Sequence, residues 1–410
     1  MVLMSDSAEL ARPAGGRPGS IAEVFWVFLR LGLTSFGGPV AHLGYFREAF
    51  VQRRRWFSDA AYADLVALCQ FLPGPASSQV GMAIGLQRAG IGGLLAAWAA
   101  FTMPSAIILV AFAFGVSSLG DAVGTGWLSG LKAAAVAVVA QAVLGMARTL
   151  TPDAKRATIG ATAMIVVLLV PHPAVQVAAI ILGALVGLVW LRTDETHADT
   201  RQDLGAGVSR AVGAVLLAMF VLLLVALPVL AAVTAHPSLG VADVFYRAGA
   251  LVFGGGHVVL PLLEAETVQT GLIDGETFLA GYGAAQAVPG PLFTFAAFLG
   301  ASTSSGPTGL VGAAIALVAM FLPAALLVCG ALPFWDRLRH SRIARRALLG
   351  VNAAVVGILA AALYDPVFTQ GVTSPATLAL AVSVFIGQVH WKLPAWAAVI
   401  GAGIIGFVAL

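Results

Sequence analysis

Long apolar runs make up most of this sequence and restrict what it can fold into. An α-helix needs roughly 20 apolar residues to cross the hydrocarbon core of a bilayer. Seven runs meet or approach this length, at 91–117, 127–147, 174–191, 211–235, 307–330, 347–364 and 394–410. Two shorter runs, 157–170 and 373–388, remain plausible spans if they pack closely. Because only 10% of the residues are charged, against roughly 25% in soluble domains, we expect an all-α polytopic membrane protein enclosed by lipid.

Four further apolar segments are interrupted by Gly and Pro, and they form two pairs. They are centred on Phe36-Gly37-Gly38-Pro39, Pro73-Gly74-Pro75, Phe253-Gly254-Gly255-Gly256 and Pro289-Gly290-Pro291. The Phe-Gly-Gly motif recurs after 217 residues and the Pro-Gly-Pro motif after 216. A near-constant offset indicates a tandem duplication. We therefore expect about 13 membrane segments, divided between two repeats.

The duplication suggests a division of the chain. Residues 21–191 form the first repeat and residues 241–410 the second. Residues 1–20 are polar and rich in Gly and Pro, and we expect a disordered cytoplasmic tail there. The stretch 192–210 mixes both charge signs and is interpreted as a linker. Residues 211–240 then contain one additional span.

Basic residues change sides between equivalent loops. Loop 47–58 carries four Arg, whereas the charged residues of loop 264–276 are all acidic. Loop 118–126 has no basic residue, whereas loop 333–346 has five. Basic residues in short loops mark the cytoplasmic side. We therefore expect inverted-topology repeats, with the N-terminus inside and the C-terminus outside.

The same rule bears on the interrupted segments. It favours broken helices that enter the membrane and return on one side, as re-entrant hairpins. The alternative is that all thirteen apolar segments cross completely.

The four interruptions are the predicted substrate site. A helix broken inside a membrane leaves backbone groups unpaired unless protein or water satisfies them. In inverted-repeat transporters such helix N-termini point at anionic substrates. Pro75 and Pro291 suit the first position of the helices that follow the breaks. Glycines at the breaks allow backbone to approach an anion, and nearby hydroxyls add donors. The residues expected here are Gly37, Gly38, Gly74, Ser77, Ser78, Gly254, Gly255, Gly290 and Thr294. The alternative is that the motifs are structural kinks.

Charged and amide side chains within apolar runs extend this prediction. They are Arg30, Gln70, Lys132, Arg247, His257, Gln286 and Asn352. A charge at mid-membrane costs roughly 2.5 kcal/mol or more, so Arg30 and Arg247 are interpreted as compensating a dianion. Equally, each arginine can extend to the interface or pair with Glu23 or Asp243. Lys132 has the same two interpretations, and the two Gln side chains can instead bridge a helix break. For His257, and for His42, a capping or packing role is favoured over proton transfer.

Several classes of function are disfavoured. A net charge of +3 is too small to suggest nucleic-acid binding. The sequence contains no phosphate-binding loop, no paired metal-ligand spacing and no nucleophile elbow. We expect no enzymatic activity, no cofactor and no metal. Cys69 and Cys329 lie in apolar surroundings and are interpreted as buried free thiols.

Taken together, these motifs resemble those of the chromate ion transporter family, in its long-chain, two-domain form. The resemblance rests on Phe36-Gly37-Gly38-Pro39, on both Pro-Gly-Pro motifs, on Phe253 to Val258, and on Val351 to Gly357. It implies a secondary transporter in the bacterial inner membrane that exports chromate and confers chromate resistance. Sulfate is the implied competitor or co-substrate, and a homodimer is a possible assembly. An oxyanion channel, or a transporter of sulfate or another anion, is the alternative function.

Overall fold

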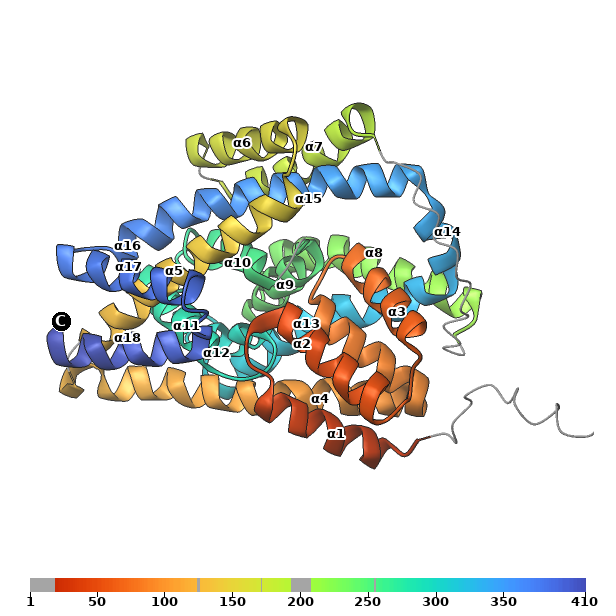
Figure 1. Cartoon of the computed structure of the whole chain (residues 1–410), viewed down its shortest axis with the longest axis horizontal. Coiled ribbons are helices and arrows are strands. Elements are labelled where there is room, and N and C mark those ends of the chain that lie inside the picture. Colours follow the sequence, from red (N-terminus) through yellow and green to blue (C-terminus); the bar gives the residue numbers. More distant parts are fainter. Residues whose placement is uncertain (1–18, 124–125, 171, 193–207, 254–255) are drawn as a thin grey trace, which may run out of the picture.

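The computed structural model describes residues 19–123, 126–170, 172–192, 208–253 and 256–410. Within these ranges the chain is helical and contains no strand (Figure 1). Five helices are long and apolar enough to cross a membrane: Ala76–Gly115, Gly126–Leu150, Arg210–Thr234, Gly309–His340 and Arg342–Gly371. The predicted all-α membrane fold is confirmed. The count of thirteen segments and the opposite insertion of the repeats stay predictions.

The first predicted interruption reverses the chain. Helix α1 (Ile21–Thr34) ends before Phe36, and α2 (Gly38–Arg47) continues into a π-helical turn, η1 (Glu48–Arg53). Phe28 of α1 packs against the rings of Phe46 and Phe50, with centroids 5.6 and 5.1 Å away. Gly37 and Gly38 have φ angles of 100° and 77°, a region that L side chains avoid. The glycines therefore allow α1 and α2 to form a hairpin.

The second interruption also reverses the chain. Helix α3 (Asp59–Phe71) leads to Pro73-Gly74-Pro75, and α4 (Ala76–Val123) follows. Within α4, Ala89 and Gly90 have non-helical backbone angles. Residues 76–88 therefore form a separate helix of about 20 Å at 1.5 Å per residue. Neither arm of this hairpin is long enough to cross the roughly 30 Å core of a bilayer.

Both hairpins return to one end of the molecule. Glu23, near the start of α1, lies 3.8 Å from Arg54 and 3.3 Å from Arg88. The guanidinium of Arg88 lies over Trp56, 4.8 Å from the ring centroid. The chain is therefore at the same end at residues 23, 54–56 and 88.

The second repeat has the corresponding elements. They are α9 (Pro237–Leu251), η2 (Gly256–Val258), α10 (Val259–Thr267), α11 (Gly275–Ala287), η3 (Leu292–Thr294) and α12 (Phe295–Ala301). Its two hairpins also have a common end, because the Ser304 hydroxyl donates to Gly271 O at 3.0 Å and Gly306 lies against Pro237. This end is reached by the far part of α4, where Phe114 lies beside Gly309. The other end of α13 (Gly309–Ala331) leads to Arg339, which pairs with Asp64 of α3 at 3.4 Å.

Long helices enclose the hairpins. The remaining elements are α5 (Gly126–Leu150), α6 (Ala154–Leu169), α7 (Pro173–Trp190), α8 (Arg210–Thr234), η4 (Leu332–Phe334), α14 (Trp335–His340), α15 (Arg342–Ala362), η5 (Leu363–Phe368), α16 (Thr369–Gly371), α17 (Pro375–Val389) and α18 (Ala395–Ala409). Glycines allow close backbone contact between these helices, as at Gly183 with Gly350 and at Gly160 with Gly357. Helix α8 lies on the outside, and Leu222 near its middle is 64% exposed.

Candidate functional site

Each Pro-Gly-Pro turn contacts the interruption in the other repeat. The Gly74 N–H donates to Val252 O at 2.7 Å, and the Gly290 N–H donates to Ser35 O at 2.8 Å. Val252 and Ser35 are the residues that precede the two Phe-Gly-Gly motifs. The two breaks also touch each other, because Gly256 lies against Pro39. The described motif residues therefore come together where the two repeats meet, and they range from exposed Gly37 to buried Gly256.

Glycine is required at both turns. Gly74 and Gly290 have φ angles of 112° and 96°. A side chain on Gly290 would meet the Ser105 hydroxyl and would come 3.2 Å from Phe101 O. At Gly74 the nearest group is the end of the Gln79 side chain, at 3.1 Å. The Gly290 turn therefore has less room than the Gly74 turn.

A buried polar cluster surrounds the Gly290 turn. Its members are Ser35, His42, Ser77 and Ser105, and Ser78 follows Ser77 on α4; each of the five is at most 3% exposed. His42 lies between two of them, with Nε2 3.2 Å from Ser35 O and Nδ1 3.4 Å from Ser77 Oγ. A carbonyl oxygen can only accept, so Nε2 carries the proton, and in a neutral ring Nδ1 accepts from Ser77. Ser105 donates to Pro289 O and connects the cluster to the other repeat.

One hydroxyl of this cluster and the neighbouring Ser78 hydroxyl lack a partner. Ser35 Oγ and Ser78 Oγ are buried and form no hydrogen bond within the described residues. A buried polar group left unsatisfied costs about 1–3 kcal/mol. Ser78 lies in the first turn of α4, where backbone N–H groups are unpaired and the helix dipole favours an anion. These groups are suited to donate hydrogen bonds to an oxyanion.

The helix starts differ in detail from the prediction. Pro75 and Pro291 were expected at the first helical position. Instead, Pro75 O accepts from Gln79 N at 2.9 Å, which makes Pro75 the N-cap of α4. Pro291 precedes a short 3₁₀ turn instead of an α-helix. The Thr294 hydroxyl donates to Pro291 O at 2.7 Å, so its hydrogen is used within its own turn.

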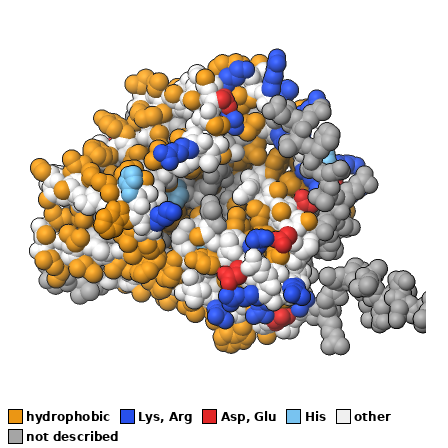
Figure 2. Space-filling model, viewed as in Figure 1, with side chains coloured by type: hydrophobic (Ala, Val, Ile, Leu, Met, Phe, Trp, Pro, Cys, Tyr) orange, Lys and Arg blue, Asp and Glu red, His pale blue; other side chains and the backbone are white. Residues whose placement is uncertain are grey.

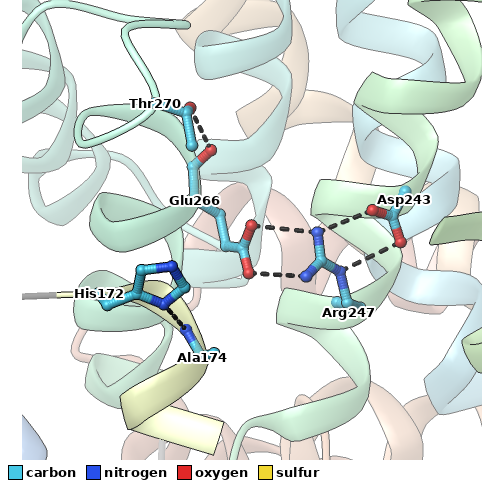
Figure 3. Close-up of polar contacts among 6 residues, drawn as sticks. All are labelled: His172, Ala174, Asp243, Arg247, Glu266 and Thr270. Carbon is cyan, nitrogen blue, oxygen red and sulfur yellow. Dashed lines mark hydrogen bonds and ion pairs between the residues drawn. The ribbon is translucent and has the colours of Figure 1, made fainter. Parts of the chain in front are cut away.

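The two matched arginines have different surroundings. Figure 3 shows Arg247 of α9 between Asp243 of the same helix and Glu266 of α10. The ion-pair distances are 2.7 and 3.0 Å. Arg247 is therefore neutralised by carboxylates, as the alternative interpretation allowed for Asp243. Arg30 is exposed and forms no ion pair among the described residues.

The other predicted site residues lie in several places. Lys132 is 8% exposed, and its Nζ lies 3.5 Å from Glu276. His257 Nδ1 lies 2.9 Å from the Tyr282 hydroxyl. Gln286 Nε2 and Asn352 Oδ1 are buried without a partner among the described residues, whereas Gln70 is exposed. Gly254 and Gly255 lie outside the described residues.

Sequence reasoning missed part of the cluster. It did not name Ser35 or Ser105, and it gave His42 a packing role. One signal was available: Ser77-Ser78-Gln79 of the first repeat corresponds to Phe293-Thr294-Phe295 of the second. Three consecutive polar residues inside an apolar segment indicate a polar environment. Ser105, next to Pro104, carries a similar but weaker signal.

These features define a polytopic membrane protein with a buried polar site at the contact between its two repeats. Comparison with known proteins identifies the family. The chain matches the chromate transporter family twice, over residues 22–189 and 239–407, and belongs to that family. It is a family of transporters and not of enzymes. No solved structure matches the chain.

Individual relatives are similar over most of their length. A probable chromate transport protein of Synechococcus elongatus is 28% identical over 91% of this chain and 96% of its own. A chromate transport protein of Pseudomonas aeruginosa is 28% identical over 95% of this chain and 93% of its own. The chromate transport protein of Cupriavidus metallidurans is 26% identical with the same coverage.

Proposed function

We propose that this chain is a secondary transporter that exports chromate from the cytoplasm and so confers chromate resistance. Membership of the chromate transporter family and the names of three relatives support this substrate. The observation that carries the proposal is the pair of unpartnered buried hydroxyls, Ser35 and Ser78, beside the N-terminus of α4. Chromate is a tetrahedral dianion that only accepts hydrogen bonds. A site of hydroxyls and free backbone N–H groups matches it.

The substrate would bind where the two repeats meet. Ser78 and the first-turn amides of α4 would donate to its oxygens, and Ser35 would donate from the facing break. His42 would position this break, because Ser35 O accepts from both His42 and Gly290. Arg30, five residues before Ser35 on α1, would supply charge. Sulfate, which has the same shape and charge, would compete.

The repeats are proposed to lie in opposite orientations, with thirteen segments, the N-terminus in the cytoplasm and the C-terminus outside. The hairpins of the first repeat begin and end near Glu23 and Arg88, and those of the second near Gly271 and Ser304. Figure 2 supports this arrangement: Lys and Arg side chains gather toward the end with α3 and α14, whereas the end with α17 and α18 is mainly apolar. Positive residues favour the cytoplasmic side.

Transport would follow an alternating-access cycle. The cluster residues are buried, so this conformation is closed around the site. Rocking of one repeat against the other would open the site to either side. An inside-negative potential favours outward movement of an anion by about 2.3 kcal/mol per charge per 100 mV. Export down this gradient is therefore feasible for a dianion.

Everted membrane vesicles provide the test. Chromate uptake into them should saturate, should be inhibited by sulfate and should be stimulated by chromate loaded inside. Non-saturating flux would indicate a channel, and uptake of sulfate without chromate would indicate a different anion transporter. No chromate uptake above that of vesicles lacking the protein would refute the proposal. Chemical crosslinking of the same vesicles would show whether the protein is a homodimer.

A further inference from the structure

One hairpin of the second repeat ends halfway along the molecule. Helices α17 and α18 have 15 residues each, about 22 Å at 1.5 Å per residue. Figure 1 shows both helices confined to the end that contains the C-terminus. The turn that joins them is His390-Trp391-Lys392-Leu393-Pro394. In a helix pair that crosses the membrane completely, this turn would lie at the opposite end of the molecule, at the membrane surface. Here the turn lies short of that end.

The depth of the turn follows from helix contacts. Leu131 of α5 lies against Gly283 of α11 and against Gly403 of α18, so these two glycines lie at similar depth. Pro394, just before α18, is nine residues before Gly403, about 13 Å along the helix. The end of α11 at Ala287 is four residues after Gly283, about 6 Å, and the Pro-Gly-Pro turn follows it. The turn therefore lies near the depth of the Pro-Gly-Pro turn. The ring of Trp396 lies 5.4 Å from that of Phe36, which places the start of α18 beside the first Phe-Gly-Gly break.

The turn is exposed although it lies at mid-depth. All five of its residues are exposed, with Trp391 at 84%, and Lys392 has a φ of 56°. Irregular backbone at membrane depth is stable only against protein or a water-filled cavity. A lysine exposed to lipid there costs roughly 2.5 kcal/mol or more. The face drawn in Figure 2 is hollowed near its middle, with Lys and Arg side chains on both sides of the hollow. Water beside the turn accounts for both observations.

The equivalent hairpin of the first repeat has a turn that lies beside acidic groups of the second repeat. Its turn carries His172, which shares a small pocket with Glu264, Gln269 and Asp365. Gln176, on the helix that follows, lies in a neighbouring pocket with Arg247 and Glu266. The second hairpin instead carries Lys392 in its turn, four residues before Trp396, whose ring lies beside Phe36 at the break that follows Arg30. The described part of the chain thus has acidic groups beside one break and cationic groups beside the other.

We propose that Lys392 lines an aqueous vestibule through which the oxyanion reaches the buried site from the cytoplasmic side. This proposal rests on the proposed function and adds a residue to its path. Helices α17 and α18 lie only in the half of the molecule nearer the C-terminus, and the hollow in Figure 2 lies between that half and the end with α3 and α14. Lys392 and Arg30 gather the dianion there. The acidic groups around His172 lie toward the opposite end, where they disfavour rebinding after release.

Thiol labelling and kinetics in everted vesicles test the vestibule. Lys392→Cys is made in a chain in which Cys69 and Cys329, both buried and free, are replaced by Ala. A charged, membrane-impermeant methanethiosulfonate should label it at least tenfold faster than Leu222→Cys, the control on the outer face of α8. Lys392→Ala should raise the KM for chromate several-fold with little change in maximal rate, and Lys392→Arg should restore the KM.

The outcomes separate this proposal from the proposed function. Labelling no faster than at Leu222→Cys, or a wild-type KM in Lys392→Ala, would overturn the vestibule while chromate transport stands. Absence of chromate transport by the wild-type chain would overturn the function itself. Labelling is measured without transport, so the two failures are distinguishable.

Discussion

The two repeats contact each other at two points, named here the Gly74 crossing and the Gly290 crossing. The backbone hydrogen bond is the same at both points, and the side chains around it differ. In each, a glycine N–H of a Pro-Gly-Pro turn donates to the carbonyl before the other Phe-Gly-Gly break. At the Gly290 crossing, Ser35, His42, Ser77 and Ser105 surround the contact. At the Gly74 crossing, the equivalent positions are Val252, Val259, Phe293 and Ala324.

This difference distinguishes residues that shape the fold from residues proposed to bind the substrate. Glycine and proline recur in both repeats because each turn and break needs their backbone angles. The polar side chains differ: Thr294 and Gln79 lie near the Gly74 crossing and donate to neighbouring carbonyls, whereas Ser35 and Ser78, on the other side, have hydroxyls without a partner among the described residues. Apolar packing at the Gly74 crossing costs nothing in hydrogen bonds and stabilises the contact. The two crossings therefore share their backbone contact, and the proposed substrate site uses the side chains of one of them.

The largest effect should come from the glycine with less room. We expect Gly290→Ala to reduce chromate transport below a tenth of wild type, because the new methyl meets Ser105 and the left-handed backbone adds about 1–2 kcal/mol of strain. Gly74→Ala should be milder, since its nearest neighbour is the flexible end of Gln79. Initial rates in everted vesicles, normalised to protein amount, measure this. Adding Ser105→Ala should recover part of the Gly290→Ala loss. Equal loss in the two single variants would contradict the difference in room.

Substitution of the two matched arginines should impair the protein in different ways. Arg30→Ala should lose most transport at normal protein levels, because Arg30 has no structural ion pair. Arg247→Ala leaves Asp243 and Glu266 without their cation, and breaking a buried pair typically costs about 3–5 kcal/mol. It should therefore lower the amount of folded protein, seen as less monodisperse protein in detergent. Replacing Asp243 by Asn and Glu266 by Gln in Arg247→Ala should restore that amount. Normal folding of Arg247→Ala alone would show that the ion pairs are not structural.

The equivalent hydroxyls of Ser78 and Thr294 test which of the two crossings binds chromate. We expect Ser78→Ala to raise the KM for chromate about tenfold, the equivalent of about 1.4 kcal/mol, because its hydroxyl is free to donate. Thr294→Val, at the equivalent position, should leave KM within about twofold, since the Thr294 hydroxyl already donates to Pro291 O. Concentration dependence of uptake gives both values. The reverse order of effects would place the substrate at the Gly74 crossing.

Different parts of this structure were predictable to different degrees. Apolar length and the Gly and Pro interruptions were enough to predict an all-α membrane fold and the described helix breaks, because both depend on local chemistry. The pairing of Gly290 with Ser35 joins residues in different repeats, and no local pattern encodes it. Asp243 was considered as a partner of Arg247 because it lies one helical turn away. Glu266 reaches Arg247 only after the chain reverses, so its role required the structure.

Substitution of Lys132 should have the smallest effect on chromate transport. It tests whether a charged residue within an apolar run always belongs to the substrate site. Its Nζ pairs with Glu276 at 3.5 Å, and the Glu276 side chain is 81% exposed. Lys132 itself is buried, but its partner is in solvent, so the pair contributes little, and a methionine fills the space of the buried lysine stem. Lys132→Met should therefore transport chromate within about twofold of wild type. Glu276→Gln should be equally mild, which is the matched control for loss of the pair. If Lys132→Met abolished uptake while Glu276→Gln did not, Lys132 would contact the substrate directly. The positive charge of the site would then come from Lys132 as well as from Arg30. The Gly290 crossing would no longer account for binding alone.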